Sequence, residues 1–151
     1  MIQRIQSVYL FLAGLVLAFT FCMPLVNFSN AEGAAGTMYA ATIVGADGNV
    51  VSHPFGVLTF TIVSILLAFA TIFLYKNRRR QIMMTNILLV LILLVYVTVI
   101  AYSMAFNAKH DATMAGSYGA IFPLASYVLG WLARRAIRKD EELIRSTERF
   151  R

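Results

Sequence analysis

Four long runs of apolar residues divide the chain, and short polar segments separate them. About 20 apolar residues in a helix span the ~30 Å hydrocarbon core of a bilayer, so runs of this length are typical of transmembrane helices. The first run is longer than the core of a signal peptide, which is about 7–15 residues, so we expect it to be retained. The predicted spans cover about residues 8–26, 55–75, 82–106 and 118–133.

This pattern predicts an all-α membrane protein with a single domain over residues 1–151, a four-transmembrane-helix bundle. Charged residues make up only 13% of the chain and hydrophobic residues 60%, which fits a membrane protein better than a soluble domain.

The longest polar segment is the predicted outer loop, residues 27–54, which contains no Lys or Arg. Two β-prone stretches, residues 37–44 and 49–51, flank the sequence Gly-Ala-Asp-Gly at 45–48. Asp-Gly between β-branched runs favours a tight turn, so we expect a small outer β-hairpin over about residues 37–52. An isolated hairpin is marginal in water, so it should lean on the third loop or on a partner.

The basic residues predict the orientation. Twelve of the thirteen Lys and Arg lie at Arg4, in the short segment after the second run, or after the fourth run; only Lys109 lies on the other side. Basic residues in short loops stay cytoplasmic. The protein is therefore predicted to be a multi-pass membrane protein with both termini in the cytoplasm. Because the basic residues flank apolar spans, the net charge of +6 is not interpreted as nucleic-acid binding.

Residues 134–151 contain no Gly or Pro and predict a cytoplasmic C-terminal helix. Its basic residues should attract anionic lipid headgroups. Its mixture of acidic and basic side chains is more than a topology signal needs, which favours a protein contact surface; a solvated helix at the interface is the alternative. The candidate partner contacts are Arg134, Arg135, Arg138, Glu141, Glu142 and Arg145.

The interiors of the predicted spans contain no ionisable residue, which argues against an ion pump or a proton-coupled transporter. The polar residues at membrane depth either bond to their own or a neighbouring helix, or line a lumen. These candidates are Thr59, Ser64, Asn86 and Thr98. We find no catalytic motif and no paired metal-ligand spacing, and a single cysteine excludes an internal disulfide. We therefore expect no enzyme, cofactor or metal site.

The opening sequence MIQRIQSVYL and the closing sequence AIRKDEELIRS together bracket the four runs. With them the chain resembles, over its whole length, an uncharacterised family of small four-helix integral membrane proteins from Bacteroidota-type bacteria. The resemblance implies an inner-membrane protein, but it supplies no catalytic residues.

We expect the protein to be a non-enzymatic accessory or scaffold subunit of a bacterial inner-membrane assembly. The alternative is a small pore or carrier for a neutral or lipid-like solute. The expected partners are membrane lipids, including anionic headgroups, and either another protein or further copies of this chain.

Overall fold

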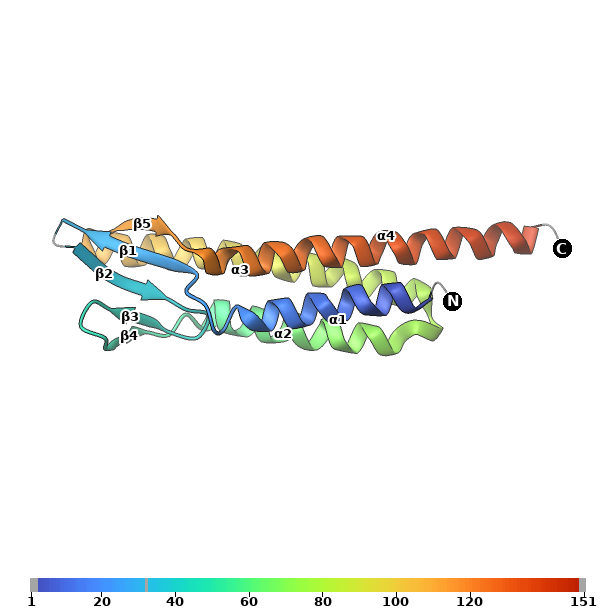
Figure 1. The fold of residues 1–151 in the computed structure, drawn as a ribbon, viewed down its shortest axis with the longest axis horizontal. Helices are drawn as coiled ribbons and strands as arrows, with labels where there is room; N and C mark the ends of the chain where they lie inside the picture. The colour runs from blue at the N-terminus through green and yellow to red at the C-terminus, as the bar shows by residue number, and fades with distance from the viewer. Residues whose placement is uncertain (1–2, 32, 150–151) are drawn as a thin grey trace.

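The computed structural model of the protein describes residues 3–31 and 33–149, with side chains from 5 to 143 apart from residue 32. Four long helices lie side by side, and a β-sheet occupies one end of them (Figure 1). The chain termini and the turn between the second and third helices lie at the opposite end. The helices are α1 (Gln3–Phe19), α2 (Phe55–Phe73), α3 (Arg78–His110) and α4 (Ile121–Arg149), with the short 3₁₀ helices η1 (Leu74–Lys76) and η2 (Tyr118–Ala120).

The helices pack through one apolar face each. Helix α1 contacts α2 and α4, and α3 contacts the same two helices. Leu10 and Leu17 of α1 are fully buried and recur at helical spacing, so they lie on the face that meets the neighbours. Gly14 lets α2 approach closely, because a β-carbon there would lie 3.1 Å from the Phe69 ring. The Ser126 hydroxyl of α4 donates to the Ala13 carbonyl of α1 at 2.8 Å.

The sheet has five antiparallel strands in the order β4-β3-β2-β1-β5. Strand β5, which follows α3, pairs with β1, so Val26 lies opposite Gly116. The two edge strands are therefore β4 and β5. The strands are β1 (Val26–Asn30), β2 (Gly33–Met38), β3 (Ile43–Gly45), β4 (Val50–Ser52) and β5 (Thr113–Gly116).

An apolar core joins the sheet to α2 and α3. Phe28 of β1 is buried and packs on Phe106 of α3 with ring centroids 4.4 Å apart. Met38 and Ile43, from β2 and β3, are buried in the same cluster. The sheet therefore shares one continuous apolar core with α2 and α3.

The prediction of a four-transmembrane-helix bundle was wrong. Among the described residues, only two stretches, Phe55–Lys76 and Arg78–His110, are long and apolar enough to cross a membrane. The first predicted span fails because the helix ends at Phe19 and the chain then enters β1. The fourth fails because charged residues begin at Arg134, within the continuous helix α4.

The prediction of a small two-stranded outer hairpin was also wrong. The chain does reverse between β3 and β4, where Gly48 adopts a left-handed φ of 77° that favours glycine. That hairpin is one part of a five-stranded sheet, which includes the end of the first apolar run and the segment after α3. The separate C-terminal helix expected after 133 is likewise an uninterrupted part of α4, described to Arg149.

Candidate functional site

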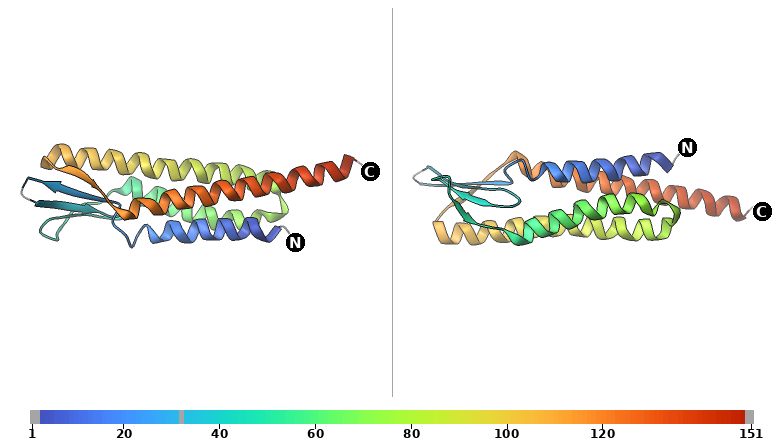
Figure 2. Two further views of the ribbon diagram at one scale, coloured as in Figure 1. Left: turned by 45° about the horizontal axis from the view of Figure 1, so that its top comes forward. Right: turned by 90° about the horizontal axis from the view of Figure 1, so that it is seen from below.

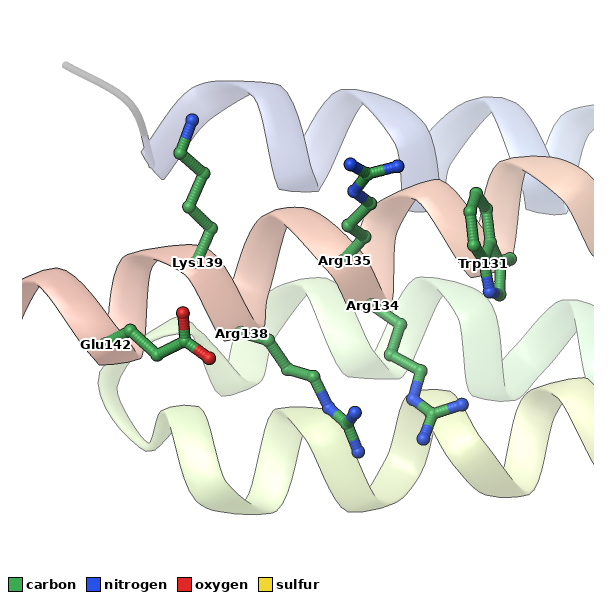
Figure 3. A pocket seen from close by; sticks show the side chains of 6 residues that line it. All are labelled: Trp131, Arg134, Arg135, Arg138, Lys139 and Glu142. Carbon is green, nitrogen blue, oxygen red and sulfur yellow. The ribbon is translucent and has the colours of Figure 1, made fainter.

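A surface hollow of about 380 Å³ follows one face of α4, which we call the α4 groove. Its lining residues recur at spacings of three and four, so they lie on one side of the helix. Figure 3 shows two rows of side chains that extend from the helix in opposite directions, one with Trp131 and one with Arg134. The α4 groove is lined by Trp131, Arg134, Arg135, Arg138, Lys139 and Glu142.

The α4 groove carries four cationic side chains and one carboxylate. Among the described residues, none of the four cations forms an ion pair. The Nε atom of Arg134 is buried and has no hydrogen-bond partner within the same part of the chain. Arg135 lies over the Trp131 ring, 5.8 Å from its centroid, which orients that guanidinium. The groove is therefore electropositive, and at least one of its donors has no acceptor within the part of the chain that the structure describes.

A second hollow of about 330 Å³ lies on the neighbouring side of α4, where α3 begins. Two cations, Arg79 and Arg138, and two carboxylates, Glu141 and Glu142, line it together with Ile82. Its charges balance, so nothing about it favours an anion.

Beneath these surfaces, α1 and α4 share a buried polar contact. Gln6 is only 4% exposed and Asp140 only 5%. The Gln6 side-chain amide donates to the Asp140 carboxylate and, at 3.4 Å, to the Ala136 carbonyl. A buried carboxylate needs such a donor, so this contact fixes how the start of α1 meets α4.

At the other end of the molecule, strand β4 borders a hollow of about 180 Å³, which we call the β4 hollow. Val51 and Ser52 form its strand side, and α3 forms the other side. The α3 residues include Tyr102, Lys109 and His110. His110 stacks on Phe106 with ring centroids 4.4 Å apart, which holds the imidazole at the rim.

The turn before β4 is ordered by its own polar contacts. The Asn49 side chain donates to the Asp47 carboxylate at 2.9 Å. That hydrogen bond lowers the pKa of Asp47 below its usual value, because it stabilises the charged form. The backbone N–H of Gly45 also donates to the Asn49 carbonyl, which closes the reversal.

The structure brings most of the predicted partner contacts together. Arg134, Arg135, Arg138 and Glu142 line the α4 groove, and Glu141 lines the balanced hollow beside it. Arg145 lies beyond the residues whose side chains the structure describes.

The polar residues at membrane depth do not converge. Thr59 is exposed on α2, whereas Ser64 is buried. The hydroxyls of Ser64 and Thr98 donate to carbonyls of their own helices, at 2.7 Å and 2.9 Å. Asn86 is partly buried, and its Oδ1 has no hydrogen-bond partner among the described residues.

Sequence reasoning missed Trp131 and Lys139 in the groove, and the whole β4 hollow. The groove could have been found from the helical spacing of 131, 135 and 139, because residues four apart share a helix face. The hollow gave no such signal, since Val51 and His110 meet only in the folded chain.

The two long apolar helices favour a membrane location for the protein. At about 1.5 Å per residue, the 22 and 33 residues of the two stretches are roughly 33 and 50 Å long. Only 28% and 33% of their apolar windows are buried inside the protein, unlike the core helices of a soluble domain. Large apolar side chains such as Leu66 and Val90 are exposed instead.

The molecule is thus a helical protein with a five-stranded sheet at one end of its helices, and two of those helices are long and apolar enough to cross a membrane. The chain belongs to the family described as Domain of unknown function (DUF4293), which matches residues 2–150. A comparison with the curated proteins finds no match to this chain.

Proposed function

We propose that the protein is a non-enzymatic accessory or scaffold subunit of a bacterial inner-membrane assembly, which it contacts through the sheet. The observation that carries this proposal is the open edge strand β4 beside the β4 hollow. All three residues of β4 are exposed. Its pairing with β3 leaves the other edge of β4 without a neighbouring strand in the described chain.

The proposed orientation follows from where the charges lie. The turn between α2 and α3 carries Lys76, Arg78, Arg79 and Arg80, and both chain termini lie at that same end (Figure 2). Basic loops stay on the cytoplasmic side. The protein is then multi-pass through α2 and α3, with the α2–α3 turn on the cytoplasmic side and the sheet facing the outer compartment.

An open edge strand binds an extended segment by main-chain hydrogen bonds, and a neighbouring pocket gives specificity through a side chain. The β4 hollow is lined by Lys109 and His110 and by no carboxylate. The proposed occupant is therefore an extended segment of a partner protein that carries an acidic side chain. The end of α4 offers a second surface, which includes Glu141 and Glu142.

No observation favours the alternative of a pore or carrier. That hypothesis needs polar groups that converge on one lumen, whereas Thr59 faces outward and the hydroxyls of Ser64 and Thr98 are bonded within their own helices.

The test is purification of the full-length protein from its native host in mild detergent, with an affinity tag inserted between β1 and β2. This placement leaves β4 and the end of α4 free. Native gels and mass spectrometry then measure the composition of the complex. We expect a partner in fixed stoichiometry that Val51→Lys removes, because a charged edge residue opposes strand addition.

Met114→Lys is the matched control. Met114 lies on the opposite edge strand and is 45% exposed, against 44% for Val51. We expect the partner to remain bound to this variant. A wild-type protein that purifies as a lone monomer or homo-oligomer would overturn the accessory function. A partner that both variants retain would overturn the assignment of β4 as the docking surface.

A further inference from the structure

The α4 groove lies where α4 changes from an apolar to a charged helix. Residues 121–133 contain no charged side chain, and Arg134 and Arg135 follow directly. Trp131 is the last aromatic residue before this change and is 44% exposed. Tryptophan is enriched at the level of the lipid headgroups, because its ring is apolar and its indole N–H is polar.

The charges that line the α4 groove favour an anionic ligand. Its four cations and one carboxylate leave a net charge of +3 (4 − 1). Guanidinium groups bind phosphate oxygens through paired N–H donors, which makes Arg134 and Arg138 suitable for a phosphate, since their side chains extend in the same direction (Figure 3). Arg135 extends in the other direction, over Trp131. The buried Nε of Arg134, without an acceptor among the described residues, supplies one such donor. The adjacent hollow has balanced charges and provides an internal contrast.

We propose that the α4 groove binds the phosphate of an anionic phospholipid headgroup, with Trp131 against the upper part of the acyl chains. The volume of about 380 Å³ suits a small polar headgroup. The proposal assigns Arg134 and Arg138 to lipid instead of a protein contact. It goes beyond the accessory function and rests only on the membrane location, so either proposal can fail without the other.

Trp131 gives this test a built-in reporter, because it is the only tryptophan in the chain. The full-length protein is reconstituted in phosphatidylcholine nanodiscs that contain a small fraction of brominated lipid. We expect brominated phosphatidylglycerol to quench Trp131 fluorescence at a several-fold lower mole fraction than brominated phosphatidylcholine does. Native mass spectrometry of the detergent-purified protein should show retained phosphatidylglycerol.

The decisive comparison is between two double variants with the same change in charge. R134Q/R138Q removes two groove arginines, whereas R78Q/R80Q removes two arginines of the α2–α3 turn outside the groove. Each basic residue near anionic lipid contributes about fivefold in affinity, so the groove variant, which lacks two of them, should bind phosphatidylglycerol about 25-fold more weakly. The turn variant should lose much less. Arg138→Gln alone, at an exposed position, serves if the double variant does not fold.

Equal quenching by the two lipids would overturn the proposal, as would equal losses in the two double variants. A free anion is distinguished by adding inorganic phosphate. If millimolar inorganic phosphate abolishes the preferential quenching by brominated phosphatidylglycerol, the groove binds a soluble phosphate and the assignment to lipid is wrong.

Discussion

The two ends of the molecule are stabilised by different interactions: apolar packing at the sheet end and polar contacts at the basic end. The sheet end, comprising β1 to β5 and the adjoining parts of α2 and α3, is stabilised by an apolar core that includes Phe28 and Phe106. The basic end comprises the α2–α3 turn, the start of α1 and residues 131–143 of α4. It has a buried polar contact and a cationic groove whose basic side chains form no ion pair with other described residues. A small sheet in water needs one face packed on a core, whereas charged headgroups attract exposed cations.

The difference teaches where each function can lie. The sheet end completes its own fold and presents the edge strand β4 beside the β4 hollow, which is a surface for protein. The basic end carries an excess of cationic side chains in the α4 groove, which makes it a surface for an anion. Substitutions at the two ends should therefore differ in how much they lower the free energy of unfolding. They should also differ in whether a second substitution, at the partner residue, restores that free energy.

The largest expected effect is at the sheet end. Phe28→Ala should reduce the free energy of unfolding by about 3–5 kcal/mol, because it removes a fully packed aromatic ring from the core. Hydrogen exchange should show loss of protection in β1, β2 and β5 before the helices. Met114→Ala, on the exposed face of β5, should change stability by at most about 0.5 kcal/mol. Equal effects of the two variants would show that this core does not anchor the sheet.

The next effect tests the polar contact at the basic end. Gln6→Leu should lower the free energy of unfolding by about 2–3 kcal/mol, because the Asp140 carboxylate would remain buried without its hydrogen-bond donor. Adding Asp140→Leu should restore most of that stability, since the double variant buries no unpaired group. Denaturant titration in detergent measures both variants. Should the double variant be less stable than Gln6→Leu, the contact would contribute net stability, and the contrast with the apolar sheet end would disappear.

The smallest effect concerns the junction between the two regions. Gly119 donates its backbone N–H to the Pro24 carbonyl at 3.1 Å, and a β-carbon at Gly119 would collide with that carbonyl. Gly119→Ala should therefore lower stability by about 2 kcal/mol and loosen β5 from β1. Gly116→Ala is the matched control, because no atom lies within 4 Å of the place its methyl group would occupy. Thermal unfolding of both variants checks this, and equal melting temperatures would contradict it.

The sequence alone was enough for the features that depend on local order. The apolar runs around 55–75 and 82–106 correspond to α2 and α3, because about 20 consecutive apolar residues need no distant partner to favour a helix in lipid. The Asp-Gly reversal depends on backbone preferences of adjacent residues, and it is found between β3 and β4. Four of the six candidate contacts on α4 share one groove because helical spacing places them on one face.

Only the tertiary structure decided the rest, because those features join residues far apart in the chain. Strand β1 lies almost entirely in the segment predicted as the outer loop; it forms because Val26 pairs with Gly116 of β5, and Phe28 reaches Phe106 of α3. The first predicted span is lost because α1 ends at Phe19, before the turn that leads into β1. The contact of Gln6 with Asp140 also has no local signature. Pairing across such distances is set by the free energy of packing the whole chain, which no short window of sequence contains.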